Sequence, residues 1–300
     1  MANIGPYVSN IRTAVYGEEV RGSIADAITA INTESESSKA TANAASATAS
    51  AAATVVGGYA GIEHRNHYRG KNLGTSITDA QKTAISSGTF DDIFIGDYWT
   101  INSIQWIVAD IDYWYYVGDT NFNRHHLVIT PSNSAVNAES TVRMHGEDST
   151  AGGYANSEMR STGLSNWRTK YSSAFGNMLL THREILSSEA VDGIPTKSNW
   201  YDCDVDIPSA TMLFGYPLER YLVPSSTGMT GFNSSPVGQL AICRLNQPAI
   251  LGRVSIWLRD VESVTAFGAM NAYKTVYTAI ATNATNYKVR PFAAIGVPAT

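Results

Sequence analysis

The chain has 300 residues, enough for one large domain and an additional extended segment, and its charged residues make up only 16% of the sequence, with a formal net charge of -5. Lysine and arginine form no dense run, which argues against a nucleic-acid partner, because neutralising phosphates requires clustered cations. The sequence contains no apolar stretch of about eighteen residues, and its first residues lack the order of a signal peptide, so we expect synthesis in the cytosol and no membrane insertion.

Residues 1–33 are predicted to form an attachment helix. Their apolar residues recur at three- and four-residue steps, which places them on one face of a helix. Gly17 is expected to interrupt or turn this helix. So short a segment cannot cover its own apolar face, which therefore needs a partner. The residues of this face are Ile11, Ala14, Val15, Val20, Ile24, Ala27, Ile28 and Ile31.

Residues 34–60 are rich in alanine, serine and threonine and admit two interpretations, a disordered linker or a thin coiled-coil stalk. A heptad seam runs on from the first helix in alternating steps of four and three residues. Alanines at such a seam bury little apolar area, so the stalk would need support at its ends. Gly57, Gly58 and Gly61 are expected to end the helix. The seam comprises Ile24, Ile28, Ile31, Ser35, Ser38, Ala42, Ala45, Ala49, Ala52 and Val56.

Residues 61–88 are predicted to form a connector with a short polar helix near its end, followed by an α+β domain over residues 89–300. Alternating apolar and polar residues with many aromatic and β-branched types predict strands within residues 90–118, 126–131, 248–261 and 287–297. Residues 172–190 are predicted to be helical, with Phe175, Met178, Leu179 and His182 on one face. Long Gly/Ser/Asn connections predict a loop-rich domain.

Cys203 and Cys243 are the only cysteines, with no second pair at metal-ligand spacing. In a reducing compartment two buried thiols are favoured over a disulfide.

Several blocks of the sequence resemble segments of known proteins. IRTAVYGEEVRGSIADAI resembles the N-terminal motif of baseplate and receptor-binding proteins from phages and prophages of Gram-positive bacteria. FDDIFIGDYWTINSIQWIVADIDY, NMLLTHREIL and WYDCDVDIPS are similar to segments of a family of phage tail domains. A WLRD strand, a variable stretch and a closing VRPF strand are similar to C-type-lectin-like folds of phage receptor binders and of diversity-generating retroelement targets.

This resemblance implies a homotrimer in the virion, at the tail tip or baseplate, with a coiled-coil stalk and a C-type-lectin-like domain. Its N-terminus would attach to other tail proteins, and its C-terminal domain would bind a bacterial surface saccharide or protein. The motifs of calcium-dependent sugar binding in animal lectins are absent, so that mode of binding is not carried over.

The variable stretch supplies the candidate ligand-binding residues, because tyrosine offers rigid contact area and asparagine adapts its hydrogen bonding. The same residue types also fill ordinary surface loops, which is the competing interpretation. Trp257, Arg259, Arg290 and Phe292 are instead expected to form the frame, with arginines paired to Asp260 or Glu262. The candidate ligand-binding residues are Phe267, Met270, Asn271, Tyr273, Tyr277, Thr278, Thr282, Asn283, Asn286 and Tyr287.

No motif predicts a catalytic centre, a metal site or a cofactor. The six histidines are expected to be structural, since none has a specific metal-ligand spacing. Asp202, Asp204 and Asp206 alternate along a strand, where a solvated face is favoured over a cation site. Glycan hydrolysis would need two carboxylates across a cleft, for which the later acidic trio or the cluster Asp91, Asp92, Asp110 and Asp112 is available.

Three functions therefore remain. The favoured hypothesis is a non-enzymatic tail protein that adsorbs to the host surface. The alternatives are a tail-associated glycan depolymerase and a purely architectural baseplate subunit.

Overall fold

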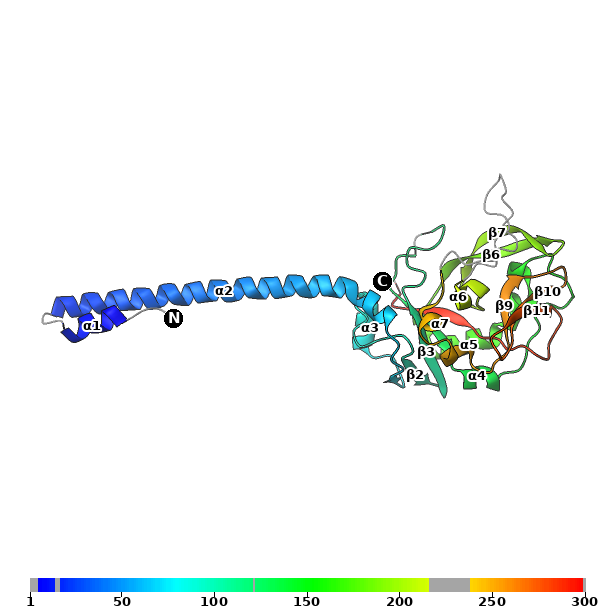
Figure 1. The fold of residues 1–300 in the computed structure, drawn as a ribbon, viewed down its shortest axis with the longest axis horizontal. Coiled ribbons are helices and arrows are strands. Elements are labelled where there is room, and N and C mark those ends of the chain that lie inside the picture. Colours follow the sequence, from blue (N-terminus) through cyan, green and yellow to red (C-terminus); the bar gives the residue numbers. More distant parts are fainter. Residues whose placement is uncertain (1–4, 14–16, 121, 216–237, 299–300) are drawn as a thin grey trace. The chain divides into compact units, whose positions relative to one another are not determined.

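The structure is a computed structural model that describes residues 5–13, 17–120, 122–215 and 238–298. It divides into two compact units, Met1–Gly58 and Tyr59–Thr300 (Figure 1). Helices and strands both make up large parts of the chain, so the predicted α+β class is confirmed. Among the described helices, none combines the length and apolar character needed to span a bilayer.

The N-terminal unit consists of α1 (Gly5–Thr13) and the first part of α2 (Gly17–Asn66). The predicted interruption at Gly17 is confirmed, because α2 begins there. Within the unit, Val20, Ala27 and Ala30 of α2 are half-buried. A different stripe of the same helix is exposed, formed by Ile24 (43%), Ile28 (62%) and Ile31 (51%).

The helix α2 runs through Gly57, Gly58 and Gly61 and ends only at Asn66. The prediction that these glycines end the helix is therefore wrong. Each glycine costs a helix interior about 1 kcal/mol relative to alanine, which contacts made by the last turn can offset. In that turn, which belongs to the C-terminal unit, the ring of His64 stacks on Phe94 with centroids 4.1 Å apart.

An ion pair fixes the same last turn of α2 to the main sheet. Arg65 Nε lies 2.5 Å from Asp110 Oδ1, and Arg65 Nη2 lies 3.1 Å from Asp110 Oδ2. The carboxylate is fully buried and also accepts hydrogen bonds from the backbone N–H groups of Ile111 and Ala241. Burial raises the pKa of Asp110 despite the arginine, so the pair is costly to separate.

The main sheet of the C-terminal unit is mixed, with one parallel pair at its edge and antiparallel pairs elsewhere. The strand nearest the C-terminus takes an inner position, which completes the sheet only when the end of the chain is in place. Strands predicted within 90–118, 126–131 and 287–297 are confirmed here. In spatial order the sheet contains β1 (Asn72–Gly74), β2 (Tyr98–Ile101), β3 (Ile104–Ile111), β4 (Leu127–Pro131), β12 (Phe292–Ile295) and β5 (Leu179–Leu180), with β8 (Val205–Asp206) also paired to β12.

A long hairpin of β6 (His182–Val191) and β7 (Ile194–Cys203) occupies much of the segment predicted to be helical. The helix prediction for residues 172–190 is wrong beyond Phe175, where α5 (Ser165–Phe175) ends. Asp192 and Gly193 connect the strands with φ values of 51° and 76°. An Asp-Gly pair with both residues in this region favours a tight hairpin turn, which outweighs the helical spacing upstream.

The second sheet has three antiparallel strands, β9 (Ile256–Val261), β10 (Ala266–Met270) and β11 (Val276–Ile280), with β10 in the centre. The segment 248–261, predicted as strand, begins with the short helix α8 (Pro248–Leu251) and becomes a strand only at Ile256. In Figure 1 this sheet lies at the right of the C-terminal unit and the β6–β7 hairpin at the top.

Short helices cover the sheets and carry the connections. The predicted polar helix is confirmed as α3 (Asp79–Ser86), whose N-terminus is closed by a capping box between Thr78 and Gln81. Both α3 and β1 come from the segment predicted as a connector, yet they belong to the C-terminal unit. The remaining helices are α4 (Asn133–Ala138), α6 (Ala210–Phe214), α7 (Ala241–Asn246), 3-10 turns at Tyr154–Asn156 and Gly176–Met178, and a π-helical turn at Met159–Gly163.

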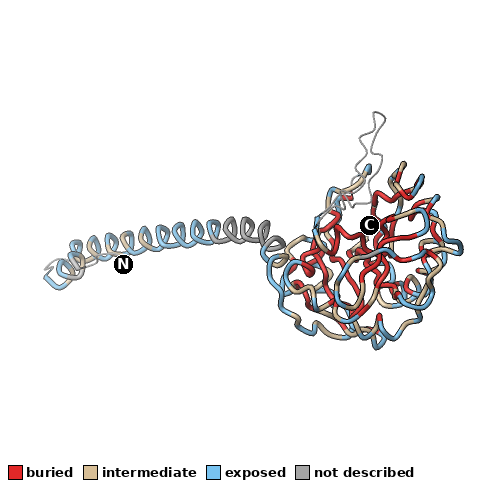
Figure 2. Tube along the Cα trace, turned by 45° about the vertical axis from the view of Figure 1, so that its right-hand side comes forward, coloured by how far each residue is buried: buried red, intermediate tan, exposed pale blue. Residues whose placement is uncertain are grey.

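The hydrophobic core lies within the C-terminal unit, where the buried segments of Figure 2 concentrate. An aromatic cluster joins the main sheet to α5, with Trp106 on β3 packing against Tyr171 at 4.5 Å and Phe175 at 5.3 Å between ring centroids. Aromatic pairs of this kind stabilise beyond their area burial. Cys203 and Cys243 are both buried and free, as favoured by the sequence.

Candidate functional site

The block that carries most of the predicted ligand residues is a sheet with exposed turns. Phe267 of β10 lies opposite Ala279 of β11 on one side and opposite Val261 of β9 on the other. Every residue of β9 and β10 is buried. The loops predicted between Phe267 and Tyr287 are therefore largely replaced by a hairpin whose inner strand belongs to the core.

Three of the predicted ligand residues lie in the core. Phe267 and Met270 are fully buried because β10 is the central strand of its sheet. Tyr287 is buried against Trp257, with ring centroids 4.7 Å apart. The prediction that these three residues form part of a binding surface is therefore wrong, since a core side chain cannot meet a ligand without disrupting its packing.

Three others shape turns. Asn271 Oδ1 accepts hydrogen bonds from the backbone N–H groups of Tyr273 at 2.9 Å and Thr275 at 3.0 Å. The next turn is closed in the same way by Asn283, whose Oδ1 accepts from the backbone of two following residues. The hydroxyl of Thr282 donates to Asp148 at 2.5 Å. These oxygens are committed to the backbone of the turns or to a neighbouring loop.

The remaining candidates are exposed where the structure describes them. Tyr273, at the tip of the β10–β11 turn, is 88% exposed, and Thr278 and Asn286 are also exposed. The side chain of Tyr277 lies outside the described residues. Thr278 and Ile280 share one face of β11, because alternate residues of a strand point the same way. We call Tyr273, Thr278 and Ile280 the hairpin surface.

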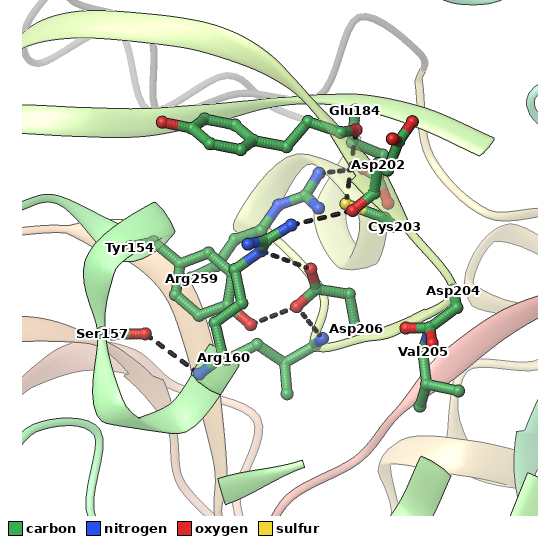
Figure 3. Close-up of polar contacts among 12 residues, drawn as sticks. Tyr154, Ser157, Arg160, Glu184, Asp202, Cys203, Asp204, Val205, Asp206 and Arg259 are labelled. Atoms are coloured by element: carbon green, nitrogen blue, oxygen red, sulfur yellow. Dashed lines mark hydrogen bonds and ion pairs between the residues drawn. The ribbon is translucent and has the colours of Figure 1, made fainter. Parts of the chain in front are cut away.

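A buried ionic cluster joins β6, β8 and β9, and Figure 3 shows its polar contacts. Arg259 Nη2 lies 2.5 Å from Glu184 Oε2. Asp206 accepts a hydrogen bond from the hydroxyl of Tyr154, and Arg160 Nε approaches its Oδ2 at 3.8 Å. All of these side chains except that of Arg160 are almost fully removed from solvent.

The electrostatics of this cluster favour a structural role. Burial alone would raise the pKa of Glu184, but the charge of Arg259 and the hydrogen bond with His182 outweigh it and hold that pKa at about 2. Burial raises the pKa of Asp206 despite Arg259. Burial also raises the pKa of the Cys203 thiol well above its usual range, which keeps it an unreactive thiol. The cluster therefore holds β6, β8 and β9 in fixed positions relative to one another.

The acidic trio at 202, 204 and 206 is only partly the predicted solvated face, because the side chains of Asp202 (73%) and Asp204 (40%) are exposed whereas Asp206 is buried. Asp202 Oδ1 accepts from Arg183 at 3.0 Å, and Asp204 Oδ1 accepts from Arg168 at 3.1 Å. Asp206 is buried in the cluster described above. Each carboxylate is thus neutralised separately, because the chain bends between β7 and β8 and sends the three side chains to different arginines. Within the described ranges, no group of three or more His, Cys, Asp or Glu residues could hold a metal ion.

The other acidic cluster is divided among separate partners as well. Asp92 pairs with Arg69 and Lys71, Asp110 with Arg65, and Asp112 with His125. The hydroxyl of Thr89 donates a hydrogen bond to Asp91.

The adjacent histidines 125 and 126 occupy different environments, as their positions in an extended segment predict. His125 Nδ1 lies 2.7 Å from Asp112 Oδ2, and its ring is partly exposed. His126 is fully buried, and the backbone N–H of Trp114 donates to its Nε2 at 3.1 Å. Burial lowers the pKa of His126 to about 3, so this ring is neutral in the folded protein.

The residues predicted to form the frame are all buried. Arg259 forms an ion pair with Glu184, a residue that was not named as its partner from the sequence. Arg290 donates to the backbone carbonyl of Pro131 at 2.6 Å and to Asn133 Oδ1 at 2.5 Å. Both arginines therefore link segments that are distant along the chain. Glu184 was missed because its segment was assigned to a helix; the Asp192-Gly193 turn signal would have placed it on a strand.

Comparison of the chain with protein-family models, with curated proteins and with solved structures gave no match.

Proposed function

We propose that the chain is a structural protein of a bacteriophage tail or tail-like particle that binds the bacterial host surface. In this proposal it is a homotrimer, held at the tail tip or baseplate of the virion through its N-terminal unit. The C-terminal unit makes the contact with a surface saccharide or protein, and no chemical step is required. The tail assignment rests on the N-terminal motif, and the binding role rests on the geometry of the hairpin surface.

The binding role is supported chiefly by the exposure of Tyr273 on an ordered turn. Its side chain is 88% exposed, while the turn that carries it is held by two hydrogen bonds from backbone N–H groups to Asn271 Oδ1. A tyrosine on a fixed turn offers a large contact area with little conformational entropy to lose on binding. Thr278 and Ile280 add a hydroxyl and an apolar contact on the neighbouring strand.

Support for the trimer comes from the exposed stripe of α2. Ile24, Ile28 and Ile31 are exposed in a single chain, although the helix already buries part of another face within its own unit. Fully burying an isoleucine stabilises by about 1.5–3 kcal/mol, so a parallel coiled coil of copies would gain much here. Three copies would also join three weak sites into one durable attachment through avidity.

The C-type-lectin-like fold is part of the proposal too. The WLRD sequence lies on β9, and the VRPF sequence leads into β12. Between them stands the hairpin that carries the exposed candidates, which is the place where the resemblance expects variable residues.

The proposal is tested by adsorption to purified walls from a panel of bacteria, with Tyr273→Ala as the variant. We expect saturable binding by the native protein without released reducing ends, and binding reduced about tenfold or more by the variant. Val191→Ala is the control, because Val191 is an exposed apolar residue (52%) that lies outside the hairpin surface, at the end of β6. Absence of adsorption to every wall, or equal binding by Tyr273→Ala, would overturn the role of the hairpin surface.

The two alternatives give different results in the same setting. A depolymerase would release reducing ends from the wall. An architectural subunit would neither adsorb nor compete with phage for adsorption to cells.

A further inference from the structure

A pocket of about 430 Å³ lies on the C-terminal unit away from the predicted ligand residues, none of which lines it. Its walls come from the connection between β3 and β4, from the segment that leads through β5 into β6, and from Asp202 on β7. Small-molecule sites commonly have volumes of about 300–1,000 Å³. The pocket therefore has room for one sugar ring with its substituents.

The walls are held in place by Arg183. Its Nε and Nη2 atoms donate to the two carboxylate oxygens of Asp119 at 2.7 and 2.9 Å, and its Nη1 donates to Asp202 at 3.0 Å. These hydrogen bonds lower the pKa of Asp119. Gly118, with φ of 124°, lets the loop pass so close that a Cβ there would lie 2.8 Å from Arg183 Cβ. The loop is thus clamped to the hairpin, which reduces the entropy lost on binding a ligand.

Solvent-exposed polar residues line this pocket. Within the described part of the chain, no side-chain hydrogen bond or ion pair is formed by the lining residues Thr120, Asn123, Arg124, Asn177 and Thr181. This contrasts with the asparagines of the hairpin turns, whose oxygens are occupied by backbone N–H groups. Hydroxyl and amide groups can both donate to and accept from a ligand rich in hydroxyl groups, and a guanidinium group donates.

The pocket also has apolar lining. Phe122 and Leu180 are buried in the hydrophobic core and line the pocket together with Leu179. A sugar ring presents a face of C–H groups and a rim of hydroxyls, which matches an apolar wall beside unpartnered polar groups. A protein epitope would instead bury roughly 800 Å² per partner across a broad surface, which a small concave site does not provide.

We propose that this pocket binds one polyhydroxylated sugar unit, as a second recognition site beside the hairpin surface. The proposal rests on the proposed function only for the source of the sugar, a bacterial surface glycan. Neutral and acidic sugars share the ring chemistry that the pocket recognises. Arg124, which has no carboxylate partner among the described residues, distinguishes them by favouring an acidic substituent.

The test is titration of the full chain with glucose, N-acetylglucosamine and glucuronic acid, followed by calorimetry or ligand-observed NMR. We expect saturable binding of at least one sugar, weakened about tenfold by Asn123→Ala and by Asn177→Ala, since each removes about one hydrogen bond. Preference for glucuronic acid that is lost in Arg124→Ala would identify an acidic unit. Asn137→Ala, an exposed residue of α4, is the matched control and should bind as the native protein does.

Failure of this proposal is distinguishable from failure of the proposed function. Absence of binding to all three sugars, or sugar binding unchanged in both asparagine variants, overturns the pocket even if wall adsorption persists. Sugar binding that needs Asn123 and Asn177, combined with no adsorption to any wall, supports the pocket and overturns the host-binding role.

Discussion

Nη2 of Arg259 on β9 lies 2.5 Å from Oε2 of Glu184 on β6, and both side chains are at most 3% exposed. The pair connects the β6–β7 hairpin to the three-stranded sheet that carries the hairpin surface. His182 Nε2 lies 3.1 Å from the other carboxylate oxygen of Glu184, so both oxygens have a partner. Removal of the Glu184 carboxylate would take from the buried guanidinium of Arg259 the oxygen with which it forms this ion pair.

We expect Glu184→Gln to lower the free energy of unfolding by about 3–5 kcal/mol, because Arg259 would keep a buried, unpaired charge. Urea denaturation measures this loss. Glu189→Gln on the same strand is the control, since its pair with Lys197 is solvent-exposed and should contribute little. Equal losses in the two variants would show that burial does not set the strength of the Glu184 pair.

The pH dependence of this pair follows from the depressed pKa. Glu184 has a pKa of about 2 in the folded protein and an ordinary value of 4.5 when unfolded. Its stabilising contribution is therefore complete above pH 4.5 and is lost as the pH falls toward 2.

Asp260 is expected to act in the opposite sense. Its buried carboxylate accepts a hydrogen bond from the backbone of Ala210 at 2.7 Å, and burial raises its pKa from 3.8 to about 7, with a further contribution from Glu262. Between these values the folded state holds a proton that the unfolded state has released, so the free energy of unfolding falls as the pH rises. Above pH 7 the loss is complete.

Asp260→Asn should remove this pH-dependent loss. The difference in unfolding free energy between the variant and the native protein is expected to grow in favour of the variant by about 1.4 kcal/mol per pH unit from pH 4 to 7, or on the order of 4 kcal/mol in total. Denaturant titrations at pH 4, 5, 6, 7 and 8 measure this difference. A difference that stays constant over the range would contradict a raised pKa at Asp260.

The sequence predicts those elements whose periodicity has no competing signal. Alternation within residues 90–118 and 126–131 predicts β2, β3 and β4, and the polar segment near the end of the connector predicts α3. The helix prediction was wrong after Phe175 because that segment has apolar residues at helical spacing and is also followed by an Asp192-Gly193 turn, which favours a hairpin. Pairing between strands decides such a case, and pairing is not visible within one segment.

The candidate site was predictable in composition but not in exposure. Tyr273 and Phe267 are both aromatic residues of the same block, yet one is at a turn and the other is on a central strand. Their difference in exposure arises only because Phe267 pairs with strands on both sides of β10, whereas Tyr273 lies in the turn after it. The ion pairs were hidden for a related reason, since the partner of Arg259 is a residue far away along the chain that the fold brings into contact.

The exposed stripe of α2 should control the oligomeric state. We expect the native protein to sediment with three times the 32.3 kDa mass of one chain and Ile28→Glu to shift the equilibrium to monomers, because the substitution places a charge at the seam of the proposed coiled coil. Analytical ultracentrifugation measures this shift. Asn43→Glu adds the same charge at an exposed position outside the seam and should remain trimeric. A monomeric native protein, or two variants with the same mass distribution, would remove the support for the stalk.

A side chain at Gly193, in the turn of the β6–β7 hairpin, should destabilise the folded protein. Its φ of 76° is strained for other residues, and a Cβ there would lie 2.4 Å from the backbone carbon of Ser263, in the connection before β10. Gly70 has nearly the same φ of 77°, but the nearest atoms to a Cβ there belong to the side chain of Tyr68, with its hydroxyl at 3.3 Å and two ring carbons at 3.6 Å. Gly70→Ala should therefore cost about 1–2 kcal/mol from the left-handed backbone alone.

Gly193→Ala should lower the free energy of unfolding by that amount and by about 1–3 kcal/mol more, because two backbone segments must move apart. Thermal and urea unfolding of the two variants measure the difference. Since the contact with Ser263 holds the hairpin against the sheet of the hairpin surface, Gly193→Ala is also expected to weaken wall adsorption while Gly70→Ala leaves it unchanged. If both alanine variants lose the same stability, the close approach at Gly193 does not constrain the folded state.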